Sequence, residues 1–281
     1  GRRDHAGFLT TTFTDAGTDI TLINDKGYDA CSYFFPDGKH LIWTSVRDKM
    51  GTSGKLEGDW SDWQHYPQGA ELYISDRQGG HVKRLTNNDY YEAEVTVSPD
   101  GKWIVFGRQI KGNMDLWVMN ADGTGEHQIT FTEDWQEGAP YFLPDSNTIL
   151  FRAWKASEYG QRPTPMTIFT IKRDGSDLKT QTHTHEMNWA PYPTPDGKHF
   201  LYVRIEPGSN NWEVYLGELD AGPDVKPRRL TFDDGFDGFP SISPDGRKMV
   251  WTTNRSDAKK AFMQNLRLHV MDVSSLGLGP K

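Results

Sequence analysis

Cysteine is nearly absent from this chain, and long apolar runs are absent altogether. Cys31 is the single cysteine among 281 residues, so no disulfide can form within the chain. No stretch of about 18 apolar residues occurs, which excludes a transmembrane helix in this sequence. Positive charge is also scarce, because 31 Lys and Arg stand against 39 Asp and Glu, for a formal net charge of −8. Such an acidic chain is poorly matched to a phosphate backbone, so nucleic acid is excluded as the expected partner.

Patterns that mark common catalytic sites are also missing. The chain has no Gly-x-Ser-x-Gly motif, which would place a hydrolase nucleophile on a sharp turn. His183 and His185 alternate on one predicted strand and share a face, as metal ligands can, but a polar edge strand explains them more simply. Cys31 precedes a strand of apolar residues, and we expect it to be a small buried core residue. The sequence therefore predicts no catalytic residue.

Turn-forming residues are abundant and evenly spread. The chain holds 28 Gly and 16 Pro, scattered rather than clustered, as in proteins made of many short strands joined by turns. Aromatic residues make up 12 % of the chain and include ten Trp, so a large packed core is expected rather than disorder. These features favour a globular chain rich in β-structure.

A Pro-Asp motif recurs five times and sets the period of the chain. Its prolines are Pro36, Pro99, Pro144, Pro195 and Pro244, separated by 63, 45, 51 and 49 residues. Pro presets φ near about −65° and the glycine that usually follows the aspartate accepts positive φ, so the chain reverses tightly at each copy. Repeats of this length are typical of the blades of a propeller.

Each repeat contains four predicted strands. In the second copy these are the run before Pro99, residues 103–106, residues 116–119 and a polar edge strand within 126–131. The runs are too short, and too rich in β-branched and aromatic residues, to be helices. We therefore expect an all-β fold, a β-propeller of four-stranded antiparallel blades, whose radial packing leaves only short protected edges.

These motifs resemble those of the PD40, TolB-like family of β-propellers. The matching segments are Ser-Pro-Asp-Gly-Lys at 98–102, Ser-Pro-Asp-Gly-Arg at 243–247, Met-Asn-Ala-Asp-Gly at 119–123, and Arg-Leu-Thr at 84–86 and 229–231. The resemblance covers nearly all of the chain after about residue 17. It is far more specific for fold than for function, because one propeller fold hosts many activities.

The number of blades is the point on which the chain departs from that family. Family members usually close with six blades, whereas five Pro-Asp units occur here, so we predict five blades, with a six-bladed ring as the alternative. The last unit supplies three strands, ending at 266–272, and residues 19–24 match the fourth strand of a blade. We expect this N-terminal strand to pair with the C-terminal blade and close the ring. Residues 1–17 would form an N-terminal arm, and residues 18–281 a single propeller domain.

A polar residue stands seven positions before each motif proline. These residues are Asp29, Glu92, Glu137, Asn188 and Asp237. In a propeller this position opens the innermost strand, so we expect the five side chains to ring one mouth of the central channel. Carboxylate and amide oxygens are ligands that Ca²⁺ selects, and converging acids also attract cationic groups. The same side chains can instead cap their own turns or bond to backbone amides.

Arginines form a second, looser repeat after the second strand of each unit. They are Arg47, Arg108, Arg152, Arg204 and Arg255. Each would pair with a ring acid of its own or the next blade, which would make the ring mainly structural, because a paired carboxylate is less free to bind a metal.

Long loops are predicted on the same face as the ring, between second and third strands. The largest spans 47–69, another spans 154–165, and a third, 254–264, is basic. The candidate partner-binding residues on them are Trp60, Trp63, Tyr66, Trp154 and Tyr159. Exposed Trp and Tyr are favoured at interfaces, and loops of this length are usually functional or disordered. The alternative is that these rings fold back onto the channel.

Two functions are compatible with these features, and we favour a non-catalytic module that binds or scaffolds proteins. The family resemblance implies a periplasmic or otherwise exported bacterial subunit that docks on a larger envelope or membrane-associated assembly. The alternative is a Ca²⁺-dependent propeller enzyme of the lactonase, hydrolase or polysaccharide lyase type, in which ring-bound Ca²⁺ would polarise a substrate oxygen. His65 is its best candidate base. Trp135 and Trp189, beside ring positions, could stack on a ligand in either case.

Overall fold

Two compact units make up the chain, Gly1–Glu133 and Asp134–Lys281. The computed structural model describes residues 11–13, 20–50, 62–205, 208, 211–255 and 265–280. Within these residues the regular structure consists of β-strands and two short 3₁₀ turns, η1 (Ala156–Glu158) and η2 (Ser274–Leu276). The predicted all-β class is confirmed.

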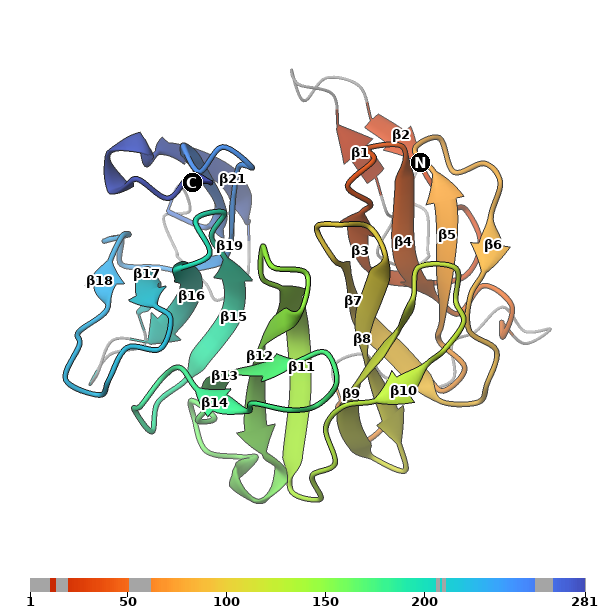
Figure 1. Ribbon diagram of the computed structural model, residues 1–281, viewed down its shortest axis with the longest axis horizontal. Coiled ribbons are helices and arrows are strands. Elements are labelled where there is room, and N and C mark those ends of the chain that lie inside the picture. Colours follow the sequence, from red (N-terminus) through yellow and green to blue (C-terminus); the bar gives the residue numbers. More distant parts are fainter. Residues whose placement is uncertain are drawn as a thin grey trace. The chain divides into compact units, whose positions relative to one another are not determined.

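The first unit holds two four-stranded antiparallel sheets and a two-stranded hairpin (Figure 1). The hairpin is formed by β1 (Thr11–Phe13) and β2 (Ile20–Leu22). The first sheet contains β3 (Asp29–Phe34), β4 (His40–Ser45), β5 (Glu71–Asp76) and β6 (Lys83–Arg84). The second sheet contains β7 (Tyr91–Val97), β8 (Trp103–Ile110), β9 (Asn113–Asn120) and β10 (His127–Gln128). Each strand pairs with the next along the chain, as predicted for a blade.

The second unit continues the same pattern with three sheets. The third sheet contains β11 (Trp135–Phe142), β12 (Thr148–Lys155), β13 (Thr167–Lys172) and β14 (Lys179–Thr180). The fourth contains β15 (Asn188–Pro193), β16 (His199–Ile205), β17 (Trp212–Glu218) and β18 (Arg228–Arg229). The fifth contains β19 (Asp237–Ile242), β20 (Lys248–Thr253) and β21 (Arg267–Asp272). The described residues thus form five blade-type sheets, the number predicted.

The Pro-Asp motif forms the turn between the first and second strands of each sheet. Asp37 Oδ1 accepts the backbone N–H groups of Lys39 and His40 at 2.8 and 3.1 Å, and Asp245 Oδ1 accepts that of Arg247 at 3.0 Å. The hydrogen bond from Lys39 is the main reason that the pKa of Asp37 is lowered from its ordinary value. The aspartate side chain therefore stabilises each turn by accepting backbone N–H groups of the same turn, which explains why aspartate recurs after the proline.

A threonine side chain just after each short fourth strand hydrogen-bonds to the backbone of the third strand. The Thr86 hydroxyl accepts the backbone N–H of Leu72 at 2.9 Å, just beyond the two residues of β6. The equivalent bonds in the next three sheets run from Leu116 to Thr130, from Ile168 to Thr182 and from Val214 to Thr231. Because a fourth strand pairs through only two residues, this side-chain bond adds a third point of attachment.

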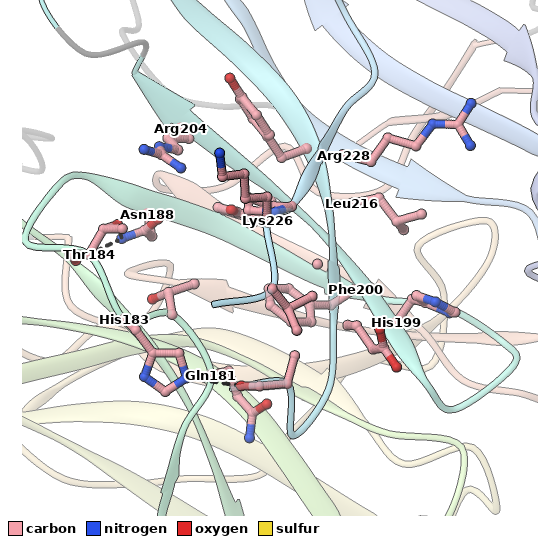
Figure 2. A pocket seen from close by; sticks show the side chains of 18 of the residues that line it. Gln181, His183, Thr184, Asn188, His199, Phe200, Arg204, Leu216, Lys226 and Arg228 are labelled. Carbon is pink, nitrogen blue, oxygen red and sulfur yellow. Dashed lines mark hydrogen bonds between the residues drawn. The ribbon is translucent and has the colours of Figure 1, made fainter. Parts of the chain in front are cut away.

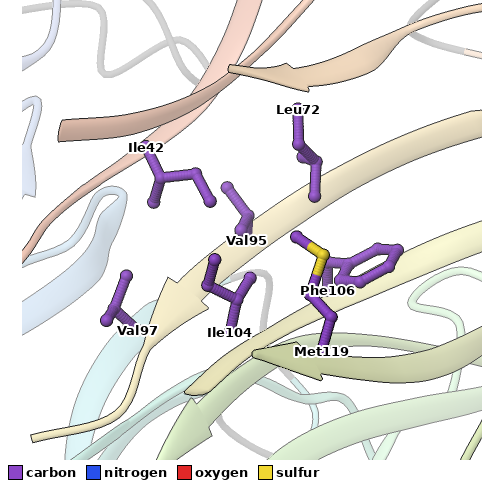
Figure 3. Packing of buried hydrophobic residues seen from close by; sticks show 7 residues of the cluster. All are labelled: Ile42, Leu72, Val95, Val97, Ile104, Phe106 and Met119. Atoms are coloured by element: carbon purple, nitrogen blue, oxygen red, sulfur yellow. The ribbon is translucent and has the colours of Figure 1, made fainter. Parts of the chain in front are cut away.

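Apolar side chains between neighbouring sheets of one unit form its core. In the first unit the cluster drawn in Figure 3 joins β4 and β5 to β7, β8 and β9. Its members, all at most 3 % exposed, are Ile42, Leu72, Val95, Val97, Ile104, Phe106 and Met119. Burying a side chain of this size contributes about 1.5–3 kcal/mol relative to leaving it in water. The second unit has corresponding clusters around Leu150 with Phe200, and around Leu201 with Trp251.

Residues 20–22 form a local hairpin, and their predicted pairing with the C-terminal blade, which would join the two units, stays a prediction. β2 pairs antiparallel with β1, with Thr12 opposite Thr21, while β21 pairs with β20 in a sheet of three strands. Part of the predicted arm, residues 1–17, is therefore a strand. A partner a few residues away closes a much shorter loop than one at the other end of the chain and costs less chain entropy. The single domain predicted for residues 18–281 stays a prediction.

Candidate functional site

The polar residues that precede the Pro-Asp turns all lie where the first strand of a sheet begins. Asp29, Asn188 and Asp237 begin β3, β15 and β19, and Glu92 and Glu137 are the second and third residues of β7 and β11. All five are buried, with at most 2 % of the residue exposed. We refer to this end of each sheet as its first-strand end. Two of the residues belong to the first unit and three to the second.

Glu92 is part of a buried chain of charges in the second sheet. Its Oε1 accepts hydrogen bonds from Arg108 Nε at 2.6 Å and from Asn88 Nδ2 at 2.7 Å. Arg108 also donates through Nη2 to Glu126 Oε2 at 2.7 Å. Burial raises the pKa of Glu92, and the charge of Arg108 opposes that rise. The carboxylate is therefore held by groups of its own sheet.

Asp29 is bound to the segment that leads into β3. Asn24 Nδ2 donates to Asp29 Oδ1 at 2.8 Å. Burial raises the pKa of Asp29, and hydrogen bonds, Asn24's among them, together with the charge of Arg47 oppose the rise. The Arg47 guanidinium itself lies 5.6 Å from the centre of the Trp43 ring, within cation–π range.

In the second unit, Asp237 is bound by two donors from the end of β20 and the residues after it. Trp251 Nε1 donates to its Oδ1 at 3.0 Å, and Arg255 Nη2 donates to its Oδ2 at 2.7 Å. The predicted pairing of the repeated arginines with acids of their own sheet is thus confirmed for Arg255, as it is for Arg108.

Asn188 and Glu137 complete the set. Asn188 Nδ2 donates to the carbonyl oxygens of Met166 at 2.9 Å and Glu186 at 3.1 Å. Its Oδ1 is buried and has no hydrogen-bond partner among the described residues. The neighbouring Arg204 binds Glu186 rather than any of the five polar residues at the first-strand ends. Glu137 is 2 % exposed and lies beside the Gly138–Arg152 pair of the β11–β12 ladder.

Each first strand also contains a β-bulge two residues after its polar residue. The bulged residues and their φ angles are Cys31 (37°), Glu94 (54°), Ala139 (48°), Ala190 (49°) and Phe239 (50°), and the ladder shifts register at each. A non-glycine residue in this left-handed region costs about 1–2 kcal/mol. A bulge re-aims the side chains around it.

Cys31 is where the bulge corrects the sequence analysis. We expected a buried core residue, whereas the structure shows an exposed one. The bulge between Ala30 and Ser32 removes Cys31 from the alternation of the strand, so its position in the sequence no longer tells which face it occupies.

Four aromatic rings gather at the first-strand end of the fourth and fifth sheets. This aromatic cluster consists of Trp189, Trp212, Phe236 and Phe239. Trp189 meets the edge of Phe239 at 4.7 Å and that of Trp212 at 5.7 Å, and Phe236 lies 5.6 Å from Trp212. Phe236 is 2 % exposed, whereas Phe239, on its bulge, is 45 % exposed. Trp189 is one of the two rings predicted to stack on a ligand. Trp135, the other one, packs against Phe169 with 5.5 Å between the ring centres.

The candidate partner-binding aromatics of the loops divide into buried and exposed rings. Trp60 lies outside the described residues. Trp63 and Tyr66 are half-buried, and Tyr66 packs on Tyr91 with ring centres 4.5 Å apart. Trp154 is 7 % exposed and Tyr159 48 %, with 5.6 Å between their ring centres. Tyr66 thus packs on the neighbouring second sheet and Trp154 is buried in its own sheet, and binding by these residues stays a prediction.

The histidines considered as ligands or bases make local contacts. His183 Nε2 lies 3.0 Å from the Ala221 carbonyl oxygen, and His65 Nδ1 lies 2.6 Å from Asp62 Oδ2. His185 Nε2 lies 3.3 Å from a carboxylate oxygen of Glu158. Among the described residues no group of three or more His, Cys, Asp or Glu side chains is arranged to hold a metal ion. No helix in that part of the chain is long and apolar enough to cross a membrane.

A set of buried acids on the third strands was missed by the sequence analysis. Glu71, Asp115 and Glu213 lie near the starts of β5, β9 and β17. Glu213 is fully buried and accepts hydrogen bonds from Arg229 Nη2 and Thr231 Oγ1, each at 2.5 Å. Burial raises the pKa of Glu213, and these donors oppose the rise. For Glu71 and Glu213 the available signal was an acid at the start of a third strand with an Arg-Leu-Thr segment after the next turn, whereas the corresponding segment after Asp115 is Gln-Ile-Thr.

The chain is similar in sequence to longer bacterial proteins. It is 26 % identical over 182 residues to an uncharacterised protein of Agrobacterium fabrum, covering 61 % of this chain and 53 % of that protein. It is 23 % identical over 247 residues to dipeptidyl-peptidase 5 of Porphyromonas endodontalis, covering 70 % of this chain and 35 % of the peptidase. The chain therefore spans about half or less of the length of these curated relatives.

Comparisons of structure and of family place the chain among propellers. TolB from Acinetobacter baumannii superposes with a TM-score of 0.69 at 18 % identity, covering 93 % of this chain and 56 % of that one. The predicted TolB-like resemblance is thus confirmed as a likeness of fold. Residues 67–222, more than half of the chain, match the family described as the Tricorn protease N-terminal beta propeller domain. With its five blade-type sheets, the chain belongs to that β-propeller family.

Proposed function

We propose that this chain is a protein-binding β-propeller module whose binding surface includes the aromatic cluster. The observation that carries the proposal is Phe239, a 45 % exposed ring that stands on a bulge at φ 50° and packs edge-on against Trp189. Aromatic side chains supply much of the binding energy at protein interfaces. Strained backbone positions also cluster at binding sites, where the surrounding structure holds them in place.

The hydrogen bonds of the carboxylates at the first-strand ends favour binding through aromatic side chains rather than through unpaired carboxylate charge. Glu92 and Asp237 each accept a hydrogen bond from an arginine of their own sheet, and Asp29 accepts one from Asn24. A carboxylate that is bonded in this way attracts a cation less strongly than a bare one. A partner would therefore gain more from contact with exposed aromatic surface.

The wider biological setting follows from the resemblance to TolB-like propellers. We infer an exported, periplasmic module that docks on a larger envelope or membrane-associated assembly as a scaffold. The tests of this inference are the compartment in which the mature chain accumulates and the proteins that it contacts there.

A photo-crosslinking experiment tests the binding proposal. A benzoylphenylalanine residue replaces Phe239 in the chain expressed in the cells that make it naturally, and Leu178 serves as the matched control. Leu178 is 58 % exposed in the same unit, but it lies in the β13–β14 turn, at the opposite end of its sheet from the start of β11. We expect a protein adduct from position 239 and none from 178. The absence of an adduct at 239, or the same adducts at both positions, would contradict the proposal.

A Ca²⁺-dependent enzyme remains the second candidate, supported by the buried carboxylates at the first-strand ends. Its test is thermal unfolding with and without Ca²⁺, because ligand bound to the native state at a hundredfold excess over Kd stabilises it by about 2.7 kcal/mol. A shift that Glu137→Gln removes would favour this candidate over the binding module.

A further inference from the structure

A pocket of about 510 Å³ opens within the second unit. Its walls come from β16 and β17, from the loop between β17 and β18, and from the segment 181–184 that follows β14. Figure 2 shows side chains of all these segments around one space, with Asn188 and Arg204 on one side and His199 on another. The fourth sheet thus has a ligand-sized space of its own.

Two buried polar atoms beside this pocket lack partners. Asn188 is 1 % exposed and lines the pocket, and its Oδ1 accepts no hydrogen bond among the described residues. Arg204 stands opposite Asn188 in the β15–β16 ladder and also lines the pocket. Its Nη2 binds Glu186, while its Nε donates to no acceptor in the described part of the chain. A buried acceptor and a buried donor left in this way cost free energy unless something bonds to them.

The repeat itself marks this place as an exception. The four other sheets have an acid where the fourth has Asn188, and in two of them an arginine of the same sheet donates to that acid, Arg108 to Glu92 and Arg255 to Asp237. Here a neutral amide replaces the acid, so the position brings no negative charge of its own beside Arg204. The carboxylate paired with Arg204 is that of Glu186, which is not part of the pocket lining, so a negatively charged ligand would meet no carboxylate at this position of the pocket wall.

Positive charge also surrounds the pocket mouth. Lys226 and Arg228 are exposed side chains of its lining, and neither makes an ion pair within the described residues. Glu218 is the single acidic side chain among the lining residues. In a chain with a net charge of −8 this local excess of cations is unusual, and it would draw an anion toward the pocket.

Aromatic rings form the inner wall. Phe200 and Tyr202 are at most 2 % exposed and Tyr215 is 6 % exposed, and the Arg204 guanidinium lies 5.8 Å from the centre of the Tyr215 ring. Burial raises the pKa of Tyr202 to about 12, so its phenol is neutral at physiological pH and adds no negative charge to the wall. The pocket therefore combines apolar walls, a buried donor and acceptor, and cations at its mouth.

We propose that this pocket binds a small organic carboxylate that also carries a hydrogen-bond donor. The carboxylate would lie between Lys226 and the Arg204 Nε, with Arg228 on the other side of the pocket adding positive charge, and the N–H or O–H donor would bond to Asn188 Oδ1. Two sources have this chemistry, the C-terminal residue of a peptide and a free hydroxy acid. The proposal does not depend on protein binding by the aromatic cluster.

Calorimetric titration of the whole chain tests the proposal with two probe arms. One arm uses N-acetylated amino acids and their carboxamides, and the other uses gluconate and glucose. We expect the free carboxylates of one arm to bind and their neutral counterparts not to bind, and the arm that binds identifies the source. Failure of both arms to bind would overturn the proposal.

Substitutions then place the ligand. The double variant Lys226→Gln with Arg228→Gln should weaken binding about tenfold, because it removes two cations at the mouth. Its matched control is Lys198→Gln with Arg247→Gln, two exposed cations outside the lining, which should bind as the wild type does. Asn188→Asp puts an acid at this position, as in the other sheets, but it also removes the Nδ2 donor to the carbonyl oxygens of Met166 and Glu186, so its melting temperature is measured first. The folded variant should no longer bind the carboxylate. Equal affinity in all three variants would refute the assigned site.

Discussion

Replacing Ala190 by glycine should stabilise the protein, although the same change usually destabilises a strand. Ala190 is half-buried in β15 with φ at 49°, in the left-handed region. An L-residue there costs about 1–2 kcal/mol, and glycine escapes that penalty. Glycine in turn loses about 0.5–1 kcal/mol more in chain entropy than alanine on folding. The difference leaves Ala190→Gly more stable by about 0.5–1 kcal/mol.

The control for this prediction is Ala30→Gly. Ala30 is half-buried, as Ala190 is, and lies beside the bulge of β3, but its φ is not positive. Glycine there should therefore destabilise by about 0.5–1 kcal/mol. Thermal unfolding followed by circular dichroism compares the variants, and a change of 1 kcal/mol shifts Tm by about 2 °C in a chain of this size. Shifts of the same sign at both positions would refute the assignment of strain to the bulges.

Three further predictions concern the turns, the third-strand acids and the buried carboxylates at the first-strand ends. Burial opposes ionisation of Asp196, but hydrogen bonds from Thr194 and from the Lys198 backbone N–H outweigh it and lower the pKa of Asp196 in the folded protein. The ionised carboxylate therefore stabilises the fold at pH values above 3.8, its pKa in the unfolded chain, and this stabilisation is lost as pH falls through the lower pKa of the folded state. In urea unfolding, the stability advantage of the wild type over Asp196→Asn should shrink between pH 5 and about pH 3. Thr231→Ala leaves the Val214 N–H without its acceptor and takes one donor from Glu213, and we expect a loss of about 1–3 kcal/mol in urea unfolding, most of which Thr231→Ser should recover. Ca²⁺ should leave Tm unchanged, because most of the buried carboxylates at the first-strand ends already have donors; a rise that Glu137→Gln removes would contradict this.

Local turn chemistry is what made the fold predictable from the sequence. Each Pro-Asp motif carries its own geometry, since the proline presets φ and the aspartate accepts the N–H groups that follow, as Asp37 does. Five such turns therefore predicted five sheets, each with its first two strands joined by a tight antiparallel turn. The position seven residues before the proline was predictable for the same reason, and Glu92 and Asp237 lie at the first-strand ends as expected.

The bulges, the ring contacts and the pocket could not be predicted in the same way. A bulge shifts the register by one residue, and no residue type marks it, because Cys31, Ala190 and Phe239 occupy equivalent bulges. Exposure of Phe239 and of Cys31 follows from that shift. The pocket depends on a loop, 221–228, which differs in every repeat, and on the single replacement of an acid by Asn188. The pairing of β2 with β1 could not be predicted either, because the pattern of residues in a strand does not indicate which partner strand closes the shorter loop.

The most direct test of the central claim is the affinity of the protein identified by crosslinking for Phe239→Ala and Leu178→Ala. Truncating a central aromatic side chain of an interface costs about 2 kcal/mol or more, which corresponds to about a thirtyfold rise in Kd. We predict that rise for Phe239→Ala, with Leu178→Ala binding as the wild type does and both variants melting as folded proteins. Unchanged affinity of a folded Phe239→Ala variant would contradict the assignment of the binding surface to the aromatic cluster.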